Sequence, residues 1–304
     1  MKPPSFIYHR PATVDEALTL LAGAGPDGKV LAGGQSLVPV LNMRLAAPGQ
    51  LVDINRLAEL AYVRCDAETV RVGALARHAA VQRDGGAHAV LPLLRQATAN
   101  VAHPAIRNRG TTVGSLAHAD PAAELPAVLA LVEGRVEIAS TGGRRSVAAA
   151  DFFVGPLESA LRTGELAVEA VFPVPPPRTG SAWLEISRRR GDYAVCGVGI
   201  LVTVDEDGRV TRVRAAFVSV GPTPVLVDLT DAVVGQRAAS VDWAAAGALA
   251  AGAVHPEDDI HASAAYRRHL VGVLIARAAH TAAAHSVGAP AAAAPPGPAE
   301  VGRS

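Results

Sequence analysis

The pattern of hydrophobic and polar residues switches between helical and strand periodicity many times along the 304 residues. Thr13 to Glu16 form a capping box, which predicts an amphipathic helix through about Leu21 that stops at Gly23 and Gly25. The other elements predicted for the first half are strands at 29–32, 51–54, 135–139, 145–147 and 165–172, a hairpin of 62–65 with 70–73, helices at 37–44, 91–102 and 122–131, and a polar loop over 104–121.

Residues 173–177, with the sequence PVPPP, form the clearest linker in the chain. Such a run is stiff and extended and cannot join the interior of a sheet, so it predicts a domain boundary. Beyond it the pattern predicts strands at 182–187, 197–204 and 210–220 and helices at 241–253 and 263–285. Strands and helices interleave on both sides of the linker without regular βαβ units, which predicts two α+β domains.

Composition narrows the class of protein. Twenty-eight basic residues balance 28 acidic ones, whereas a general nucleic-acid binder would need a basic field. Two cysteines cannot supply the four thiolates of an ordinary iron–sulfur cluster, and Cys65 and Cys196, each within an apolar strand, are expected to be buried core thiols. No signal core opens the chain, and no stretch approaches the ~18 uncharged apolar residues that a membrane helix needs. We therefore expect a soluble, cytoplasmic protein without a membrane span.

The loop Gly33-Gly34-Gln35-Ser36 follows a predicted strand and opens a predicted helix. Adjacent glycines allow the backbone to approach a ligand closely and to point N–H groups at an anion. Ser36 could cap the helix or donate to a phosphate oxygen, so an anion cradle and an ordinary tight turn both remain open. The segment 23–28 also matches GxGxxG, but it follows a helix and precedes a strand, which favours a helix stop over a dinucleotide fingerprint.

The segment 106–121, IRNRGTTVGSLAHADP, is the densest in chemistry. Its hydroxyls and backbone amides suit a pyrophosphate, and a carboxylate suits ribose hydroxyls. Each residue also has an ordinary interpretation, with Thr111 and Thr112 as turn formers, Asp120 as the cap of the next helix and His118 as a satisfied polar residue. No third ligand stands at metal spacing from His118 and Asp120, so no metal site is expected.

A basic loop at 187–193, SRRRGDY, follows a predicted strand. It is either a solvated turn or a loop that reaches a ligand and offers Tyr193 as a stacking face. The motifs HExxH, GxSxG and CxxC are missing from the sequence, so no side chain is assigned a catalytic role.

The segments AGGQSLVP (32–39), IRNRGTTVGSLAHADPAAELP (106–126) and SRRRGDYA (187–194) resemble, in this order and spacing, the FAD-binding medium subunit of the molybdenum hydroxylases, the carbon monoxide dehydrogenase and xanthine dehydrogenase family. FVSVGPTP (217–224) and ASAAYRRHL (262–270) resemble that subunit's C-terminal domain. The resemblance implies an α+β fold, with a two-lobed FAD-binding domain of the vanillyl-alcohol-oxidase (PCMH) type followed by a smaller α+β domain. Its expected bounds are 1–176 (lobes about 1–57 and 58–176) and 180–285, with a disordered tail at 286–304.

The same resemblance implies that FAD lies between the two lobes, with the redox chemistry at the flavin. The cofactor-binding residues that it implies fall into a first phosphate loop, a second phosphate loop, an adenosine side and a flavin side. They are Val30, Leu31, Ala32, Gly33, Gly34, Gln35, Ser36 and Leu37; Thr111, Thr112, Val113, Gly114 and Ser115; Asp120, Glu124 and Leu166; and Val101, Ala102 and Tyr193.

The sequence departs from the family pattern at three places. Val113-Gly114 replaces a pair of glycines in the second loop, and because a branched residue disfavours positive φ, that loop is expected to close differently or to bind less tightly. Leu184 and Glu185 stand where xanthine-oxidising relatives place a lysine, which weakens an assignment to purine oxidation. Val101 stands where those relatives often carry an aromatic residue.

The function implied is electron relay. A molybdopterin large subunit oxidises the substrate, an iron–sulfur small subunit carries single electrons, and the FAD of this chain passes them to an external acceptor, in a dimer of heterotrimers. Two alternatives remain, a stand-alone FAD-dependent oxidoreductase of the same fold and a flavin-free structural subunit.

Overall fold

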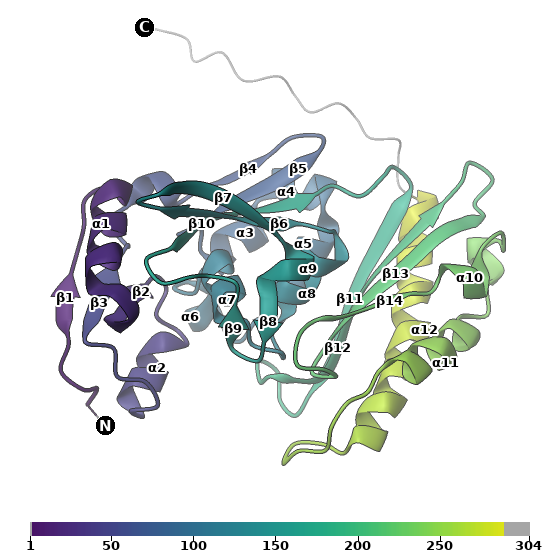
Figure 1. The fold of residues 1–304 in the computed structure, drawn as a ribbon. Coiled ribbons are helices and arrows are strands. Elements are labelled where there is room, and N and C mark those ends of the chain that lie inside the picture. The colour runs from purple at the N-terminus through teal and green to yellow at the C-terminus, as the bar shows by residue number, and fades with distance from the viewer. Residues whose placement is uncertain (1, 289–304) are drawn as a thin grey trace, which may run out of the picture.

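The structure, a computed structural model, describes residues 2–288 and consists of three sheets with helices between them, plus a small two-stranded ribbon (Figure 1). Most of the tail expected at 286–304 lies outside the described residues, but 286–288 belong to the last helix and not to a disordered segment.

The first lobe is a parallel three-stranded sheet of order β1-β3-β2. Its elements are β1 (Ile7–His9), α1 (Val14–Ala24), η1 (Gly25–Asp27), β2 (Gly28–Leu31), α2 (Leu37–Asn42) and β3 (Gln50–Asp53). As the capping pattern predicted, the Glu16 N–H donates to Thr13 Oγ1 at 3.2 Å, and α1 starts at Val14. The parallel pairing of β2 and β3 brings the ends of both strands, and the loops that follow them, to one edge.

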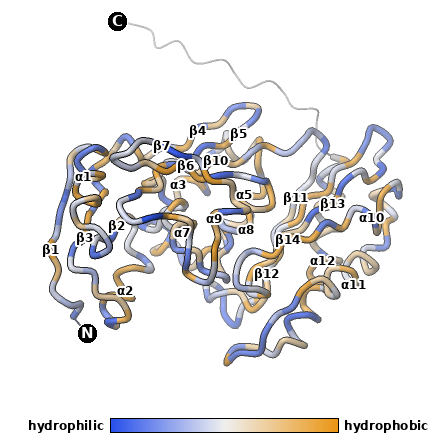
Figure 2. Tube along the Cα trace, in the orientation of Figure 1, coloured by the Kyte–Doolittle hydropathy of each residue, from blue (hydrophilic) through white to orange (hydrophobic). Residues whose placement is uncertain are grey.

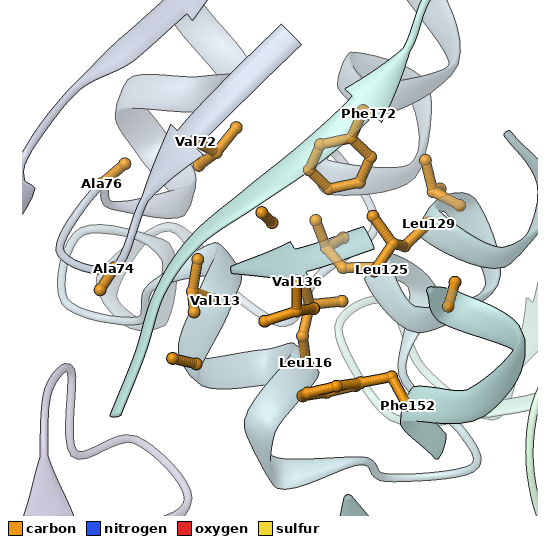
Figure 3. Close-up of a cluster of buried hydrophobic side chains, with 14 of the residues drawn as sticks. Val72, Ala74, Ala76, Val113, Leu116, Leu125, Leu129, Val136, Phe152 and Phe172 are labelled. Atoms are coloured by element: carbon orange, nitrogen blue, oxygen red, sulfur yellow. The ribbon is translucent and has the colours of Figure 1, made fainter. Parts of the chain in front are cut away.

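The second lobe is an antiparallel five-stranded sheet of order β4-β5-β10-β6-β7, with helices packed on it. Its strands are β4 (Val63–Cys65), β5 (Thr69–Gly73), β6 (Arg135–Ser140), β7 (Gly143–Ala148) and β10 (Leu166–Pro173), beside a ribbon of β8 (Phe153–Gly155) and β9 (Glu158–Ser159). Its helical elements are η2 (Ala58–Leu60), α3 (His78–Arg83), α4 (Gly85–Val90), α5 (Pro92–Thr98), α6 (Pro104–Arg107), α7 (Thr112–His118), α8 (Glu124–Leu131) and α9 (Ala149–Phe152). Figure 3 shows Phe172 of β10 and Val136 of β6 facing Leu125 and Leu129 of α8 in the core.

The C-terminal domain is an antiparallel four-stranded sheet of order β11-β12-β13-β14. Its elements are β11 (Thr179–Ser187), β12 (Ala194–Val204), β13 (Val210–Val218), β14 (Val225–Asp228), α10 (Thr230–Val233), η3 (Ala238–Ser240), α11 (Trp243–Ala253) and α12 (Ala264–Gly288). Along β13, Ala216 and Val218 pack into the core shared with the preceding lobe, whereas Ala215 and Phe217 pack toward the helices of this domain. Figure 2 shows hydrophilic residues in the turns between these strands.

The helix α12 meets the length and hydropathy criterion for a membrane span, although no such span was expected from the sequence. By length and composition α12 could cross a membrane, with a mean hydropathy of 1.3 over its best window. Half of that window is buried, and Val271, Ile275 and Ala278 are fully enclosed in the core beneath β11 and β12. These contacts are those of a core helix.

Three local expectations were wrong. Cys65 is exposed, because β4 is the edge strand of its sheet; only Cys196 is a buried thiol. The stretch 104–121 contains α6 and α7 rather than one loop, and the helix expected over 91–102 ends at Thr98. Because the second loop contains glycines, the sequence pattern did not predict α7. A Cβ on Gly114 would lie 2.5 Å from Thr111 Oγ1, the atom that caps this helix, so this glycine permits the cap instead of breaking the helix.

Candidate functional site

The first glycine-rich loop leaves the end of β2, where Val30 and Leu31 lie, and reaches Leu37 at the start of α2. Gly34 has a φ of 72°, in the left-handed region that glycine adopts at little cost. Within the described residues 2–288, the N–H groups of Gly33, Gly34, Gln35 and Ser36 donate no hydrogen bond, and the Ser36 side chain does not cap α2. A run of unpaired amides in one loop has the donor chemistry that suits a phosphate.

The second predicted phosphate loop lies directly against the first. A Cβ on Gly33 would lie 2.4 Å from the Arg109 carbonyl oxygen and 2.8 Å from Gly110 Cα. Because both are backbone atoms, only glycine at position 33 permits this approach. The structure therefore brings together two loops that are 75 residues apart in the chain, which is the arrangement that one shared ligand requires.

Arg77 joins the two loops. Its Nη1 donates to the Arg109 carbonyl at 2.5 Å, and its Nη2 donates to Asn55 Oδ1 at 2.6 Å. Asn55 Nδ2 in turn donates to the Ala32 carbonyl of the first loop at 2.8 Å. One guanidinium and one carboxamide thus fix the separation of the loops, and sequence reasoning assigned a role to neither side chain.

Asp53 stabilises this network of hydrogen bonds. It is buried at the end of β3, accepts the Asn55 N–H at 2.9 Å, and also accepts a hydrogen bond from the Tyr8 hydroxyl. Burial alone would raise the pKa of Asp53, but the hydrogen bonds from Tyr8 and Asn55 outweigh it and hold that pKa below its usual value. Asp53 and Asn55 directly follow a parallel strand, a position where polar side chains often meet ligands, and this signal could have identified them.

The second loop is stabilised by the capped N-terminus of α7. Thr111 Oγ1 accepts the Gly114 N–H at 3.2 Å and caps α7, while Thr112 and Val113 are buried and Ser115 is half-buried. Val113 is 2% exposed and helical, with a negative φ, so the backbone strain expected from a branched residue here does not arise. Figure 3 shows the Val113 side chain pointing into the core.

His78 supports this helix start from inside the protein. Its N–H donates to the Gly110 carbonyl at 2.9 Å, and its Nδ1 lies 3.4 Å from Thr112 Oγ1. Burial, and then the charge of Arg107, lower the pKa of His78 to about 4. The ring is therefore neutral at physiological pH and acts as packing and hydrogen-bonding support.

A cleft between the two domains opens at Ala102. Two adjoining hollows of about 410 and 390 Å³ share Ala102 and Arg190. The remaining lining residues are Ala99, Asn100, Glu185, Ile186, Ser187 and Gly191 in one hollow, and His103, Pro104 and Arg107 in the other. Of these residues, only Ala102 was assigned a cofactor contact from the sequence.

The cleft is bordered by strained and close-packed backbone. Ala102 has a φ of 41°, which is rare for a residue with a side chain, and Arg107 Nη1 stabilises this turn by donating to the carbonyls of Val101 and Ala102 at 2.8 and 2.9 Å. Opposite, Gly191 has a φ of 88°, and a Cβ there would lie 2.5 Å from His103 Cε1. The basic loop thus touches the first domain through its glycine.

Acidic groups gather next to Tyr193, which is 69% exposed at the end of the basic loop. Burial, followed by the charge of Glu185, raises the pKa of Glu124 to about 8. Burial also raises the pKa of Glu185, although a hydrogen bond from Trp183 Nε1 at 2.9 Å opposes the shift. Surrounding protein atoms, and then Asp120 and Glu124, raise the pKa of the Tyr193 phenol.

The substitution Glu124→Gln is expected to remove a pH-dependent loss of stability. The pKa of Glu124 is about 8 in the folded protein against an ordinary value of 4.5, so between these pH values the folded state binds more protons than the unfolded state. The free energy of unfolding of the wild type should therefore fall as pH rises through this range, and the variant should be more stable by roughly 1–4 kcal/mol at about pH 8.5 and equal near pH 4.

Thermal unfolding of the FAD-loaded chain across this pH range measures the effect. Glu59→Gln, which removes an exposed carboxylate from η2, is the matched control. Profiles of wild type and Glu124→Gln that stay parallel at all pH values would contradict the expectation.

The other residues assigned from the sequence lie apart from this cleft or play supporting roles. Leu166 is buried at the start of β10, and Val101 packs against the core. Asp120 does not cap α8, which starts at Glu124; its Oδ1 accepts the Ala122 N–H at 2.8 Å and stabilises the turn before that helix.

Comparison with known proteins assigns the family. Residues 4–175 match the model for the FAD binding domain in molybdopterin dehydrogenase, and residues 181–282 match the CO dehydrogenase flavoprotein C-terminal domain. The chain is 42% identical to 6-hydroxypseudooxynicotine dehydrogenase complex subunit alpha of Paenarthrobacter nicotinovorans, over 91% of this chain and 94% of the relative.

Two solved structures have the same fold. Quinoline 2-oxidoreductase from Pseudomonas putida 86 matches with a TM-score of 0.89 at 36% identity, covering 94% of this chain and 99% of that one. Carbon monoxide dehydrogenase from Hydrogenophaga pseudoflava matches with a TM-score of 0.88 at 35% identity, covering 93% and 99%.

Fold and site together define an FAD-binding oxidoreductase subunit. The chain belongs to the medium, FAD-binding subunits of the molybdenum hydroxylase family, whose members work in multi-subunit complexes. The structure fits the cofactor, because the unpaired amides at 33–36 and the close approach at Gly33 form a cradle for a pyrophosphate.

Proposed function

We propose that this chain relays electrons, with its FAD receiving them from an iron–sulfur small subunit and passing them to an external acceptor. In this proposal a molybdopterin large subunit oxidises the organic substrate, the three chains form a dimer of heterotrimers, and the complex works in the cytoplasm. FAD, when bound, supplies the two-electron chemistry. The task of this chain is to bind the cofactor, orient it and control access to it.

The observation that carries the proposal is the paired loop cradle. The amides of 33–36 would hold the pyrophosphate, with the second loop at 111–115 completing the phosphate site. From there the flavin ring would extend toward the interdomain cleft, where Ala102 borders one wall and Tyr193 ends the loop on the other. Arg107 would keep the Val101–Ala102 turn in place beside the ring. The contacts of Glu124, Asp120 and Leu166 with the cofactor belong to the same proposal.

Two kinds of observation support partner subunits. Within residues 2–288, no group of three or more His, Cys, Asp or Glu side chains is placed to hold a metal ion. The two cysteines are isolated from each other, one exposed and one buried. An FAD relay of this kind needs single electrons from a metal centre in another polypeptide, and the relatives are named as subunits or medium chains of complexes.

The substrate is chosen outside this chain. Relatives with this same fold are named for compounds as different as 6-hydroxypseudooxynicotine, quinoline and carbon monoxide. A subunit that contacted the substrate directly would need a different pocket for each compound.

Purification of the affinity-tagged chain from its native host tests the proposal. We expect two further chains to copurify, with iron, molybdenum and FAD all present and the flavin band bleaching when the complex is reduced. The complex should oxidise a member of a panel of N-heterocycles, aldehydes and carbon monoxide with an artificial acceptor, and the isolated FAD-loaded chain should oxidise none. Activity of the isolated chain would favour a stand-alone oxidoreductase, and a folded chain without flavin would favour a structural subunit.

A further inference from the structure

Ser219, directly after β13, has an unusual backbone conformation. Its φ is 63°, in the left-handed region that glycine adopts more readily than a residue with a side chain. Glycine would fit the turn with less strain, but only a side chain with a hydroxyl group can make the hydrogen bond that Ser219 donates.

The hydrogen bonds of Ser219 join three segments. Its N–H donates to the Pro121 carbonyl of the first domain at 2.9 Å, and its Oγ donates to the Ala194 carbonyl at the start of β12 at 2.6 Å. Ala194 is the residue after Tyr193. A single serine thus connects the end of β13, the base of the Tyr193 loop and the turn that carries Asp120.

The next carbonyl along the chain, that of Val195, also accepts a hydrogen bond. Arg267 of α12, only 6% exposed, donates from Nε to the Val195 carbonyl at 3.2 Å. Its other nitrogens donate to Asp259 Oδ2 at 2.7 Å and to the Glu257 carbonyl at 2.8 Å, so the guanidinium itself cannot turn away. Two consecutive carbonyls after Tyr193 therefore have fixed directions.

Tyr193 needs such support because its ring has little packing of its own. The side chain is 69% exposed, and the loop before it consists of exposed arginines and a left-handed glycine. The hydrogen bonds at Ala194 and Val195 therefore fix the backbone from which Tyr193 extends.

We propose that Ser219, supported by Arg267, is a positioning residue that sets where Tyr193 stands at the mouth of the interdomain cleft, and through Tyr193 the surroundings of the bound flavin. The inference rests on the proposed function, in which Tyr193 packs near the flavin ring. Ser219 touches neither cofactor nor substrate and acts only through the backbone at Ala194.

The test uses the FAD-loaded chain and the fluorescence of its bound flavin, which a nearby tyrosine ring quenches. Ser219→Gly removes the hydroxyl while relieving the backbone strain, and Ser219→Ala removes it without that relief. Loss of a hydrogen bond of about 1 kcal/mol changes the ratio of held to released Tyr193 by about fivefold. We expect both variants to bind FAD at the wild-type stoichiometry, with brighter flavin fluorescence and a shifted flavin midpoint potential.

A double-mutant cycle separates positioning from a purely structural role. In a Tyr193→Leu background, Ser219→Gly should change neither fluorescence nor potential, and Arg267→Gln should reproduce the effect of Ser219→Gly in the wild-type background. Ser240→Gly removes a serine whose Oγ donates to the Arg237 carbonyl at 3.4 Å far from the cleft, and is the matched control.

Unchanged fluorescence and potential in both Ser219 variants, or a change that persists without Tyr193, would overturn the inference while leaving the proposed function intact. A folded wild-type chain that never binds FAD would overturn both.

Discussion

Gly33→Ala is expected to abolish retention of FAD. The added Cβ would lie 2.4 Å from the Arg109 carbonyl oxygen and 2.8 Å from Gly110 Cα. Neither neighbour is the end of a flexible side chain, so the two loops must separate, and the unpaired amides of 33–36 would no longer face the second loop. Overpacking of this kind costs about 1–3 kcal/mol, and an opened cradle also loses hydrogen bonds from its amides to a charged phosphate, about 1.5–3 kcal/mol each. We therefore expect FAD affinity to fall by roughly 100-fold or more.

Titration of the flavin-depleted chain with FAD, followed by fluorescence, measures this loss. Gly23→Ala is the matched control, because a Cβ there meets nothing within 4 Å and Gly23 lies in α1, where alanine is the better helix former. The control should bind FAD like the wild type and be slightly more stable. Wild-type affinity in Gly33→Ala would show that the two loops do not need their close contact to hold the cofactor.

The two loops proposed to bind phosphate could be picked out from the sequence because their signals are local. Gly33-Gly34 between a strand and a helix, and the run from Thr111 to Ser115, each carry their chemistry within a few residues. The contact between the two loops could not be predicted in the same way, because it depends on hydrogen bonds between segments far apart in the chain. Arg77 to Arg109 and Asn55 to Ala32 are contacts that only the folded sheets create.

The errors in the sequence interpretation have the same origin. Cys65 sits in an apolar strand, but only the order of the sheet shows that this strand is at an edge. Gly110 and Gly114 suggested a continuous loop, whereas Gly114 serves the cap of α7 and Gly110 gives room to the ring of His78. Ser219 lies in the segment 217–224, which stood out only by its resemblance to a family, and the role proposed for its hydroxyl could not be predicted, since it depends on a φ angle and on two partners from other segments. Local composition therefore picked out the loops that we propose hold the cofactor, and tertiary contacts determine how those loops are arranged.

Arg77→Met is expected to weaken both the fold and FAD binding, because it removes the side chain that joins the loops without touching the predicted phosphate site itself. Methionine keeps most of the apolar stem, but the donors to the Arg109 carbonyl at 2.5 Å and to Asn55 Oδ1 at 2.6 Å are lost. Hydrogen bonds from a charged donor contribute about 1.5–3 kcal/mol each, or about 3–6 kcal/mol for two. Because Arg77 is only half-buried, solvent reduces this contribution, and we expect destabilisation of about 2–4 kcal/mol and a drop in FAD affinity of at least about tenfold. Thermal unfolding and FAD titration measure the two effects, with the exposed Arg83→Met on α3 as the matched charge-removing control.

Because Asn55 still donates to the Ala32 carbonyl, the first loop should keep its anchor, and FAD binding should be weakened without being abolished. A stable Arg77→Met variant with wild-type FAD affinity would mean that Gly33 packing alone sets the distance between the loops.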